Sequence, residues 1–173
     1  PAYAAVAETV DAVQLLKKKK GYEDLLSTTV IFSRGCPYSC SFCVMPQIRK
    51  YNPGIRFKNP KLVESEIEYL KHDYDIKAIS LLDEIGIPPN KEIAIPYLKA
   101  IGRTGILWKG QCRVDGLTED VVKLARESGC VIMSMGSESV CQKSLDIINK
   151  QIDVRRVKES VRLLKQNDIE VRL

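Results

Sequence analysis

Residues 28–32 read TTVIF, residues 62–70 read LVESEIEYL and residues 76–82 read IKAISLL. The first and third stretches are short and rich in β-branched and aliphatic residues, as buried strands are. The middle stretch places apolar residues three and four positions apart, which is the spacing of an amphipathic helix. Two strands joined by such a helix form a parallel unit, because a parallel connection needs a crossover. The order strand, helix, strand therefore decides the fold class, α/β with a parallel sheet.

The same alternation continues toward the carboxyl end of the chain. Thr118 can cap a helix over residues 118–127, and Gly129 lies just past the end of that helix. Pro96 interrupts the preceding helix, which is poorly formed around residues 97–101, so we expect it to start at the proline or to be irregular before it. The remaining predicted elements are strands at 106–112 and 131–135, a helix carrying Val154, Val157, Val161 and Leu164, and the opening of a fifth strand at 169–173.

The composition is that of a globular domain: 173 residues, 45% hydrophobic and 28% charged. A net charge of +5 is too small to indicate a nucleic-acid surface. No apolar run is long enough to cross a membrane and no signal peptide is visible, so we expect a cytoplasmic protein. Residues 1–27, with apolar residues at helical spacing over 2–16, are predicted to be a helical linker or the end of an upstream domain, and residues 28–173 the core domain.

Three of the six cysteines, Cys36, Cys40 and Cys43, fall within eight residues. Thiolates at this spacing suit an iron–sulfur cluster or a zinc ion. No fourth cysteine follows nearby, and the only histidine, His72, lies at the end of a predicted helix. Three thiolates leave one iron of a four-iron cluster open for a ligand, so the spacing favours a cluster and leaves zinc as the alternative. The other three cysteines, Cys112, Cys130 and Cys141, are interpreted as core or incidental residues.

Further polar residues follow the later strands of the predicted sheet. Asp83 and Glu84 follow the second strand and Arg113 follows the third, while the fourth is followed by Gly136, Glu138 and Ser139. The carboxyl ends of parallel strands meet at one edge of the sheet, where ligands bind. We therefore expect all of these residues on the same edge as the three cysteines.

The stretch 33–43, SRGCPYSCSFC, resembles the signature of the radical S-adenosylmethionine (SAM) superfamily, including the aromatic residue before the last cysteine. Residues 83–84, 110–115 and 129–139 look like later motifs of the subfamilies that carry a cobalamin-binding domain upstream. The resemblance extends over residues 28–173. It implies a partial (βα) barrel of radical SAM type, truncated after about four βα units plus the start of a fifth strand.

This resemblance implies that Cys36, Cys40 and Cys43 hold a [4Fe–4S] cluster that reduces S-adenosylmethionine and releases a 5′-deoxyadenosyl radical. Asp83 and Glu84 would then meet the methionine ammonium, with a solvated loop pair as the alternative. Arg113 would bind the methionine carboxylate, with a salt bridge to Asp115 or Glu138 as the alternative. The remaining candidates are Gly136 close to the nucleoside, Glu138 and Ser139 toward the ribose hydroxyls or the amino-acid end, and Phe42 near the adenine. Ser139 could instead cap a helix, and Phe42 could simply exclude solvent.

The resemblance also implies partners outside the chain. It implies an external one-electron donor such as flavodoxin or ferredoxin and an unidentified small-molecule substrate, for methylation or ring formation. Cobalamin, held by a domain outside this chain, is a further cofactor compatible with it. The alternatives are a transfer-RNA methylthiotransferase, suggested by Arg49, Lys50 and Arg56, and a zinc-binding structural module.

Overall fold

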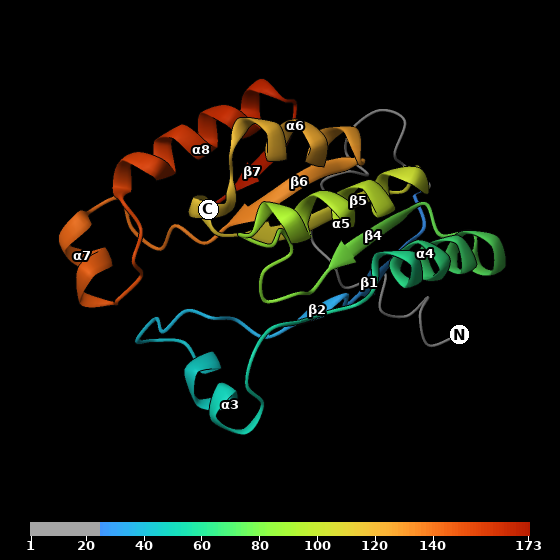
Figure 1. Cartoon of the computed structure of the whole chain (residues 1–173). Helices are drawn as coiled ribbons and strands as arrows, with labels where there is room; N and C mark the ends of the chain where they lie inside the picture. The colour runs from blue at the N-terminus through green and yellow to red at the C-terminus, as the bar shows by residue number, and fades with distance from the viewer. Residues whose placement is uncertain (1–24) are drawn as a thin grey trace.

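The computed structural model describes residues 25–173. Its centre is a five-stranded sheet in the order β1-β4-β5-β6-β7, in which every neighbouring pair is parallel. The strands alternate with helices along the chain, as the sequence predicts (Figure 1). The sheet strands are β1 (Ser27–Val30), β4 (Ala78–Leu81), β5 (Leu107–Cys112), β6 (Cys130–Met135) and β7 (Glu170–Arg172).

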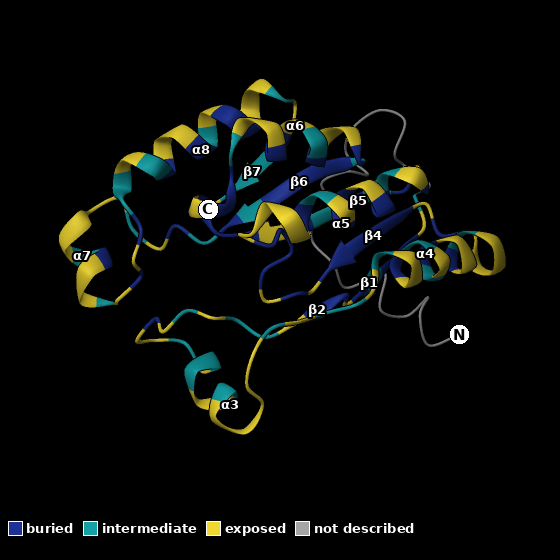
Figure 2. Cartoon of the chain, in the orientation of Figure 1, coloured by how far each residue is buried: buried dark blue, intermediate teal, exposed yellow. Residues whose placement is uncertain are grey.

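The helices over residues 60–74, 91–103, 119–127 and 154–166 cover one face of the sheet and enclose the core, which is dark blue along the strands in Figure 2. Trp108, Ile79 and Met133 on the strands are among its fully buried members. This arrangement confirms the α/β class and the partial barrel. The helices are α4 (Pro60–Tyr74), α5 (Lys91–Arg103), the 3-10 turn η1 (Val114–Gly116), α6 (Glu119–Glu127), α7 (Gln142–Ile147) and α8 (Val154–Gln166).

A small lobe projects from the end of β1, on the side to which the arrowheads of β4 and β6 point (Figure 1). It consists of the short antiparallel pair β2 (Ser33–Arg34) and β3 (Arg56–Phe57), with helix α3 (Met45–Tyr51) between them. None of the residues of α3 is buried. The loop that carries the three cysteines joins β2 to α3, so the lobe holds this loop at the carboxyl edge of the sheet.

Helix α5 differs from the prediction. It begins at Lys91, five residues before Pro96, and continues through the proline to Arg103. The Asn90 side chain accepts a hydrogen bond from the amide of Glu92 at 2.9 Å and so caps the helix at its true start. The sequence rule gave too much weight to the proline, because burial of Tyr97, Leu98 and Ile101 stabilises the helix against the lost hydrogen bond.

The end of α6 matches its prediction, and its start differs in detail. Gly129 has a φ of 95°, and a Cβ at this position would lie 2.2 Å from the Ile106 carbonyl oxygen, so only glycine fits. Thr118 occupies the N-cap position without a capping hydrogen bond, because its hydroxyl donates to the carboxylate of Asp120 at 2.5 Å.

Two further predictions concern the ends of the chain. Strand β7 confirms the opening of a fifth strand. The predicted helix over 2–16 lies outside the described residues. In the part of the chain that the structure describes, no helix has the length and apolar character to cross a membrane.

Candidate active site

A cavity of about 490 Å³ opens at the carboxyl ends of the strands. The cysteine loop forms one wall, and the residues that follow β4, β5 and β6 form the others. Most of the candidate residues thus lie at the same edge of the sheet as the three cysteines, as the sequence predicts. The predicted residues that line this cavity are Cys36, Phe42, Cys40, Cys43, Glu84, Arg113, Gly136 and Glu138; Asp83 and Ser139 do not line it.

Hydrogen bonds to its backbone hold the cysteine loop on two sides. On one side the Arg49 guanidinium donates to the carbonyl oxygens of Cys36 and Tyr38, at 3.0 and 3.1 Å. On the other, the Ser41 amide donates to the Ile148 carbonyl at 2.9 Å. A loop fixed at both ends presents its thiols in a defined arrangement before any ligand binds.

The three thiols offer soft sulfur donors from one cavity wall. Burial raises the pKa of the Cys36 thiol, and the nearby Cys43 and Cys40 raise it further. Within residues 25–173, no three His, Cys, Asp or Glu side chains form a ready site for one metal ion. Each thiolate of a four-iron cluster binds a different iron, so ligands distributed over one cavity wall suit it. The donor set, three soft thiolates from one loop, therefore fits a [4Fe–4S] group.

The two acidic residues after β4 have different positions. Asp83 is fully buried, and its carboxylate accepts hydrogen bonds from the Phe32 amide at 2.8 Å, the Ser33 hydroxyl at 2.9 Å and the Tyr97 hydroxyl at 3.2 Å. Burial raises the pKa of Asp83. The Asp83 carboxylate thus links the segment that follows β1 to α5, and Asp83 is not a solvated loop residue. Glu84 lines the cavity and accepts from the Gly35 amide at 3.1 Å.

Asp83→Ala is expected to lower the free energy of unfolding by about 2–3 kcal/mol, because it leaves buried donors without an acceptor. Tyr97→Phe is the matched comparison, since it removes one of the donors and leaves Asp83 the other two. We expect this variant to lower the free energy of unfolding by about 1 kcal/mol. Urea unfolding followed by circular dichroism measures both. Equal losses in the two variants would contradict the role assigned to the carboxylate.

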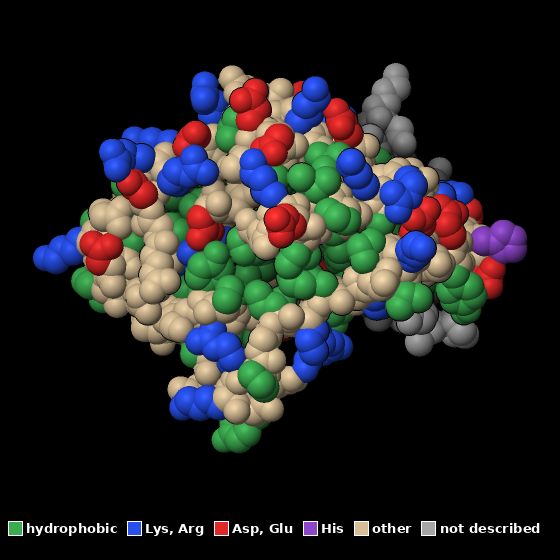
Figure 3. All heavy atoms as spheres, in the orientation of Figure 1, with side chains coloured by type: hydrophobic (Ala, Val, Ile, Leu, Met, Phe, Trp, Pro, Cys, Tyr) green, Lys and Arg blue, Asp and Glu red, His purple; other side chains and the backbone are tan. Residues whose placement is uncertain are grey.

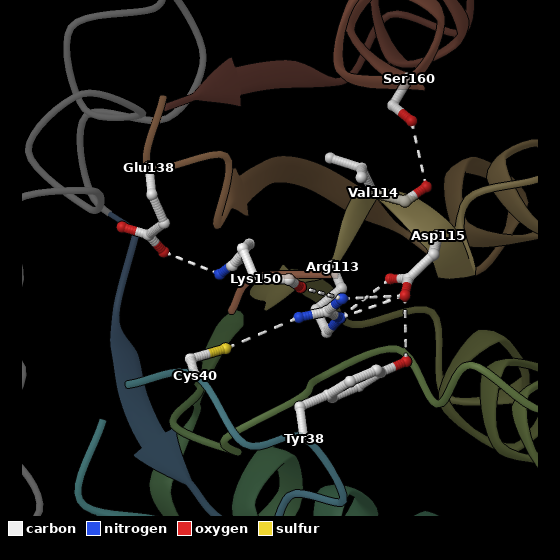
Figure 4. A network of polar contacts seen from close by, with 8 residues as sticks. All are labelled: Tyr38, Cys40, Arg113, Val114, Asp115, Glu138, Lys150 and Ser160. Carbon is white, nitrogen blue, oxygen red and sulfur yellow. Dashed lines mark hydrogen bonds and ion pairs between the residues drawn. The ribbon is translucent and has the colours of Figure 1, made fainter. Parts of the chain in front are cut away.

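Arg113 is the centre of a buried polar network, drawn in Figure 4. Its Nε donates to Asp115 Oδ1 at 3.0 Å, and a terminal nitrogen donates to Asp115 Oδ2 at 3.0 Å. Its guanidinium lies 3.5 Å from the ring centre of Tyr38, whose hydroxyl donates to the same carboxylate at 3.1 Å. Burial by itself would lower the pKa of Arg113, but Asp115 raises it overall. Of the alternatives considered from sequence, the salt bridge to Asp115 is present.

Sequence reasoning missed Lys150, which is a second cation in the cavity wall. Its side chain is 7% exposed, and its ammonium donates to Glu138 Oε1 at 2.8 Å (Figure 4). The ammonium also lies 5.7 Å from the ring centre of Phe42. Lys150 follows α7, 12 residues after Glu138, and belongs to no motif. No pattern in the sequence therefore points to it.

Gly136 and Ser139 have local roles in this geometry. A Cβ on Gly136 would lie 3.1 Å from the Lys150 ammonium and 3.3 Å from Glu138 Oε1, so the glycine gives the ion pair access to the backbone. Glu138 itself has a φ of 60°, in the left-handed region. The Ser139 hydroxyl accepts from the Cys141 amide at 3.1 Å, which is a local turn before α7.

The other three cysteines have three different environments. Cys130 is fully buried in the core and Cys141 is exposed. Cys112 is buried and also borders the cavity, and burial raises its pKa to about 12. A thiol with that pKa is neutral at physiological pH, as expected for a packing residue.

A parallel partial barrel whose strand ends surround a charged cavity with three thiols is the architecture of an enzyme core with a cysteine-bound metal cofactor. The sequence profile of the Radical SAM superfamily matches residues 30–173. The chain therefore belongs to the radical SAM superfamily, a family of enzymes that use a [4Fe–4S] cluster and S-adenosylmethionine.

Several curated relatives are named for reactions on tetrapyrroles, and another, from Pyrococcus horikoshii, is named an uncharacterized methyltransferase. The chain is 34% identical over 141 residues to the anaerobic magnesium-protoporphyrin IX monomethyl ester cyclase of Rubrivivax gelatinosus, covering 80% of this chain and 25% of the cyclase. It is 28% identical over 134 residues to the bacteriochlorophyllide d C-12(1)-methyltransferase of Chlorobaculum tepidum, covering 76% and 28%. The chain thus spans about a quarter of the length of the relatives it matches.

Solved structures share the fold. The radical S-adenosylmethionine methyltransferase TsrM from Kitasatospora setae, with tryptophan and a SAM analogue bound, has a TM-score of 0.71 at 20% identity, covering 87% of this chain and 30% of TsrM. The cobalamin-dependent S-adenosylmethionine radical enzyme OxsB, with aqua-cobalamin bound, has a TM-score of 0.68 at 18% identity, covering 83% of this chain and 23% of OxsB. At these identities the likeness concerns the fold.

Proposed function

We propose that this chain forms the cluster-binding and S-adenosylmethionine-binding part of a radical SAM enzyme. One observation carries the proposal: Cys36, Cys40 and Cys43 line a single cavity together with an acidic side chain and a basic one, Glu84 and Lys150. A [4Fe–4S] cluster bound by these thiolates would supply the electron that cleaves S-adenosylmethionine to methionine and a 5′-deoxyadenosyl radical, which takes hydrogen from the substrate. The residues of the chain must bind, orient and shield the reactants.

The amino-acid end of S-adenosylmethionine carries an ammonium and a carboxylate, and each needs a partner of opposite charge once it leaves water. Two carboxylates line the cavity, Glu84 and Glu138. Glu138 is already paired with Lys150, so Glu84 suits the ammonium. For the carboxylate, Lys150 is better suited than Arg113. Both oxygens of Asp115 already occupy the Arg113 fork, whereas Lys150 has one ionic contact, with Glu138.

Apolar side chains complete the cavity wall. Phe42, Met45, Ile85 and Met135 line the same cavity as the charged groups. Such a lining excludes water, which strengthens the ionic contacts and protects a reactive radical from side reactions. Phe42 has a second use, because its ring faces the Lys150 ammonium and limits where that cation can move.

The reaction on the final substrate is proposed to be a cobalamin-dependent methylation or a ring formation. The supporting observation is the pair of activities in the names of the curated relatives, a cyclase and methyltransferases of tetrapyrroles. Cobalamin would be bound outside this chain, and an external protein would donate the electron.

The test is anaerobic S-adenosylmethionine cleavage with dithionite as reductant, in the protein that carries this chain, with 5′-deoxyadenosine as the measured product. The spectrum of the reduced cluster by electron paramagnetic resonance should change when S-adenosylmethionine is added. A cluster signal that does not respond, with no 5′-deoxyadenosine, would refute the proposal.

Lys150→Met is expected to weaken S-adenosylmethionine binding about 10- to 150-fold, the equivalent of about 1.5–3 kcal/mol for a charged hydrogen bond. Isothermal titration of the reconstituted protein measures the dissociation constant. Lys150→Arg should restore part of the affinity because it keeps the charge. Lys143→Met, an exposed lysine on α7, is the control. Unchanged affinity in Lys150→Met, with the cluster intact, would exclude this residue from the binding site.

A further inference from the structure

The basic residues are unevenly distributed along the chain. Residues 25–63 contain six Lys or Arg and no Asp or Glu, whereas the whole chain has 27 basic and 22 acidic residues. The charge of this one segment therefore exceeds the net charge of the entire chain, +5. The segment forms β1, the small lobe and the first residues of α4. The six basic residues are Arg34, Arg49, Lys50, Arg56, Lys58 and Lys61.

The lobe also has a distinct surface. In Figure 3 its visible side chains are basic and hydrophobic, and red carboxylates gather on the body of the molecule instead. Helix α3 and its N-cap residue contribute exposed apolar side chains: Tyr51 is 90% exposed, Ile48 43% and the N-cap Val44 62%. Arginine and tyrosine around small apolar groups are the composition of protein-binding hot spots, and a helix without a buried residue is free to contact a partner.

A crevice of about 180 Å³ connects this surface to the cysteine loop. We call it the basic crevice; Arg34, Arg49 and Arg56 line it, with Glu84 as its one carboxylate. Cys36, Met45 and Glu84 line both the basic crevice and the 490 Å³ cavity. A ligand thiol is therefore part of the wall between the outer surface and the site proposed for the cluster.

The hydrogen bonds of Arg49 and Arg56 in the basic crevice go to neutral acceptors. Arg49 donates to the Cys36 and Tyr38 carbonyls and the Ser39 hydroxyl, which are neutral acceptors. Arg56 donates to the side-chain amide of Asn52. In residues 25–173 no ion pair involves any of the three arginines or Lys50. Their field is thus available to an outside anion, and exposure permits steering over about 10 Å.

We propose that the lobe surface, meaning α3 with the basic crevice, docks an acidic protein that carries a one-electron redox centre. This inference rests on the proposed function and adds the place and chemistry of the partner. On docking, one electron leaves the reduced centre of the donor, which is oxidised by one electron, and reduces the cluster by one. Cys36 is the ligand through which the electron enters. Opposite charge sets the rate of encounter, and the apolar residues of α3 hold the complex.

The test uses Arg34→Glu/Lys50→Glu/Arg56→Glu, which reverses three exposed charges and leaves Arg49 to hold the cysteine loop. Reduced flavodoxin serves as the donor, and 5′-deoxyadenosine formation is the measured rate. We expect a loss of about tenfold or more with flavodoxin and an unchanged rate with dithionite. The rate of the wild-type protein with flavodoxin should also fall with added salt, and the variant should have lost most of this dependence.

The matched control is Lys158→Glu/Arg162→Glu/Lys165→Glu, the same change of charge on exposed positions of α8. It should keep the wild-type rate with both reductants. An equal loss in the control, or a full rate with flavodoxin in the lobe variant, would overturn the docking proposal. So would a lobe variant that loses affinity for transfer RNA and keeps its rate with flavodoxin, because the surface would then bind RNA. Absence of cleavage in the wild-type protein with dithionite would refute the proposed function instead.

Discussion

Alanine in place of Cys36, Cys40 or Cys43 is expected to reduce iron and acid-labile sulfide in the reconstituted protein to background. Each thiolate would hold a different iron of the proposed cluster, and among the described residues that line the cavity the one other thiol is the neutral Cys112. The visible absorption of the cluster, its electron paramagnetic resonance signal and 5′-deoxyadenosine formation should all disappear together. This is the largest effect that we expect from any single substitution.

Cys141→Ala is the matched control, because it removes an exposed thiol outside the cavity and should leave iron content unchanged. Circular dichroism of the variants separates loss of the cluster from loss of the fold. Wild-type levels of iron in Cys40→Ala would contradict the assignment. Stoichiometric zinc in the wild-type protein, with no cluster signal after reconstitution, would favour the structural zinc module.

The sequence predicted the fold well where the signal is periodic. The apolar runs of β1, β4, β5 and β6 and the spacing in α4 depend on the same contacts that form the core, so pattern and structure agree. Pro96 is the instructive exception. The proline costs one helical hydrogen bond, but burial of the apolar face of α5 outweighs this cost. That burial depends on residues far along the chain, which a local sequence rule does not include.

The sequence predicted the location of the candidate site, at the carboxyl edge of the sheet, but not the contacts of its individual side chains. Parallel topology fixes that residues after successive strands meet, and this brought Glu84, Arg113 and Glu138 to the cysteines. The direction of each side chain depends on the turn after its strand. Asp83 and Glu84 are neighbours in sequence, yet one is bound inside the core and the other lines the cavity. Lys150 approaches through a loop after α7, which no pattern predicts.

Arg113→Met is expected to lower the free energy of unfolding by about 3 kcal/mol, because it breaks a buried ion pair and removes the stack on Tyr38. This is the lower end of the usual range, since the side chain of Asp115 is 35% exposed and water can solvate it. Arg155→Met is a close control. Arg155 also pairs with an aspartate two residues away, Asp153, but is 87% exposed, so we expect no measurable change in the free energy of unfolding.

The same substitution should change the cluster as well as the stability. A terminal nitrogen of Arg113 lies 3.9 Å from Cys40 Sγ, and a cation beside a ligand sulfur favours the reduced, more negative cluster. Removing it should lower the reduction potential, measured by redox titration with electron paramagnetic resonance. Arg113→Lys divides the two effects: it keeps the charge, and so most of the potential, but loses the planar fork and much of the stability. If both variants lose stability and neither changes the potential, Arg113 supports the loop and does not tune the cluster.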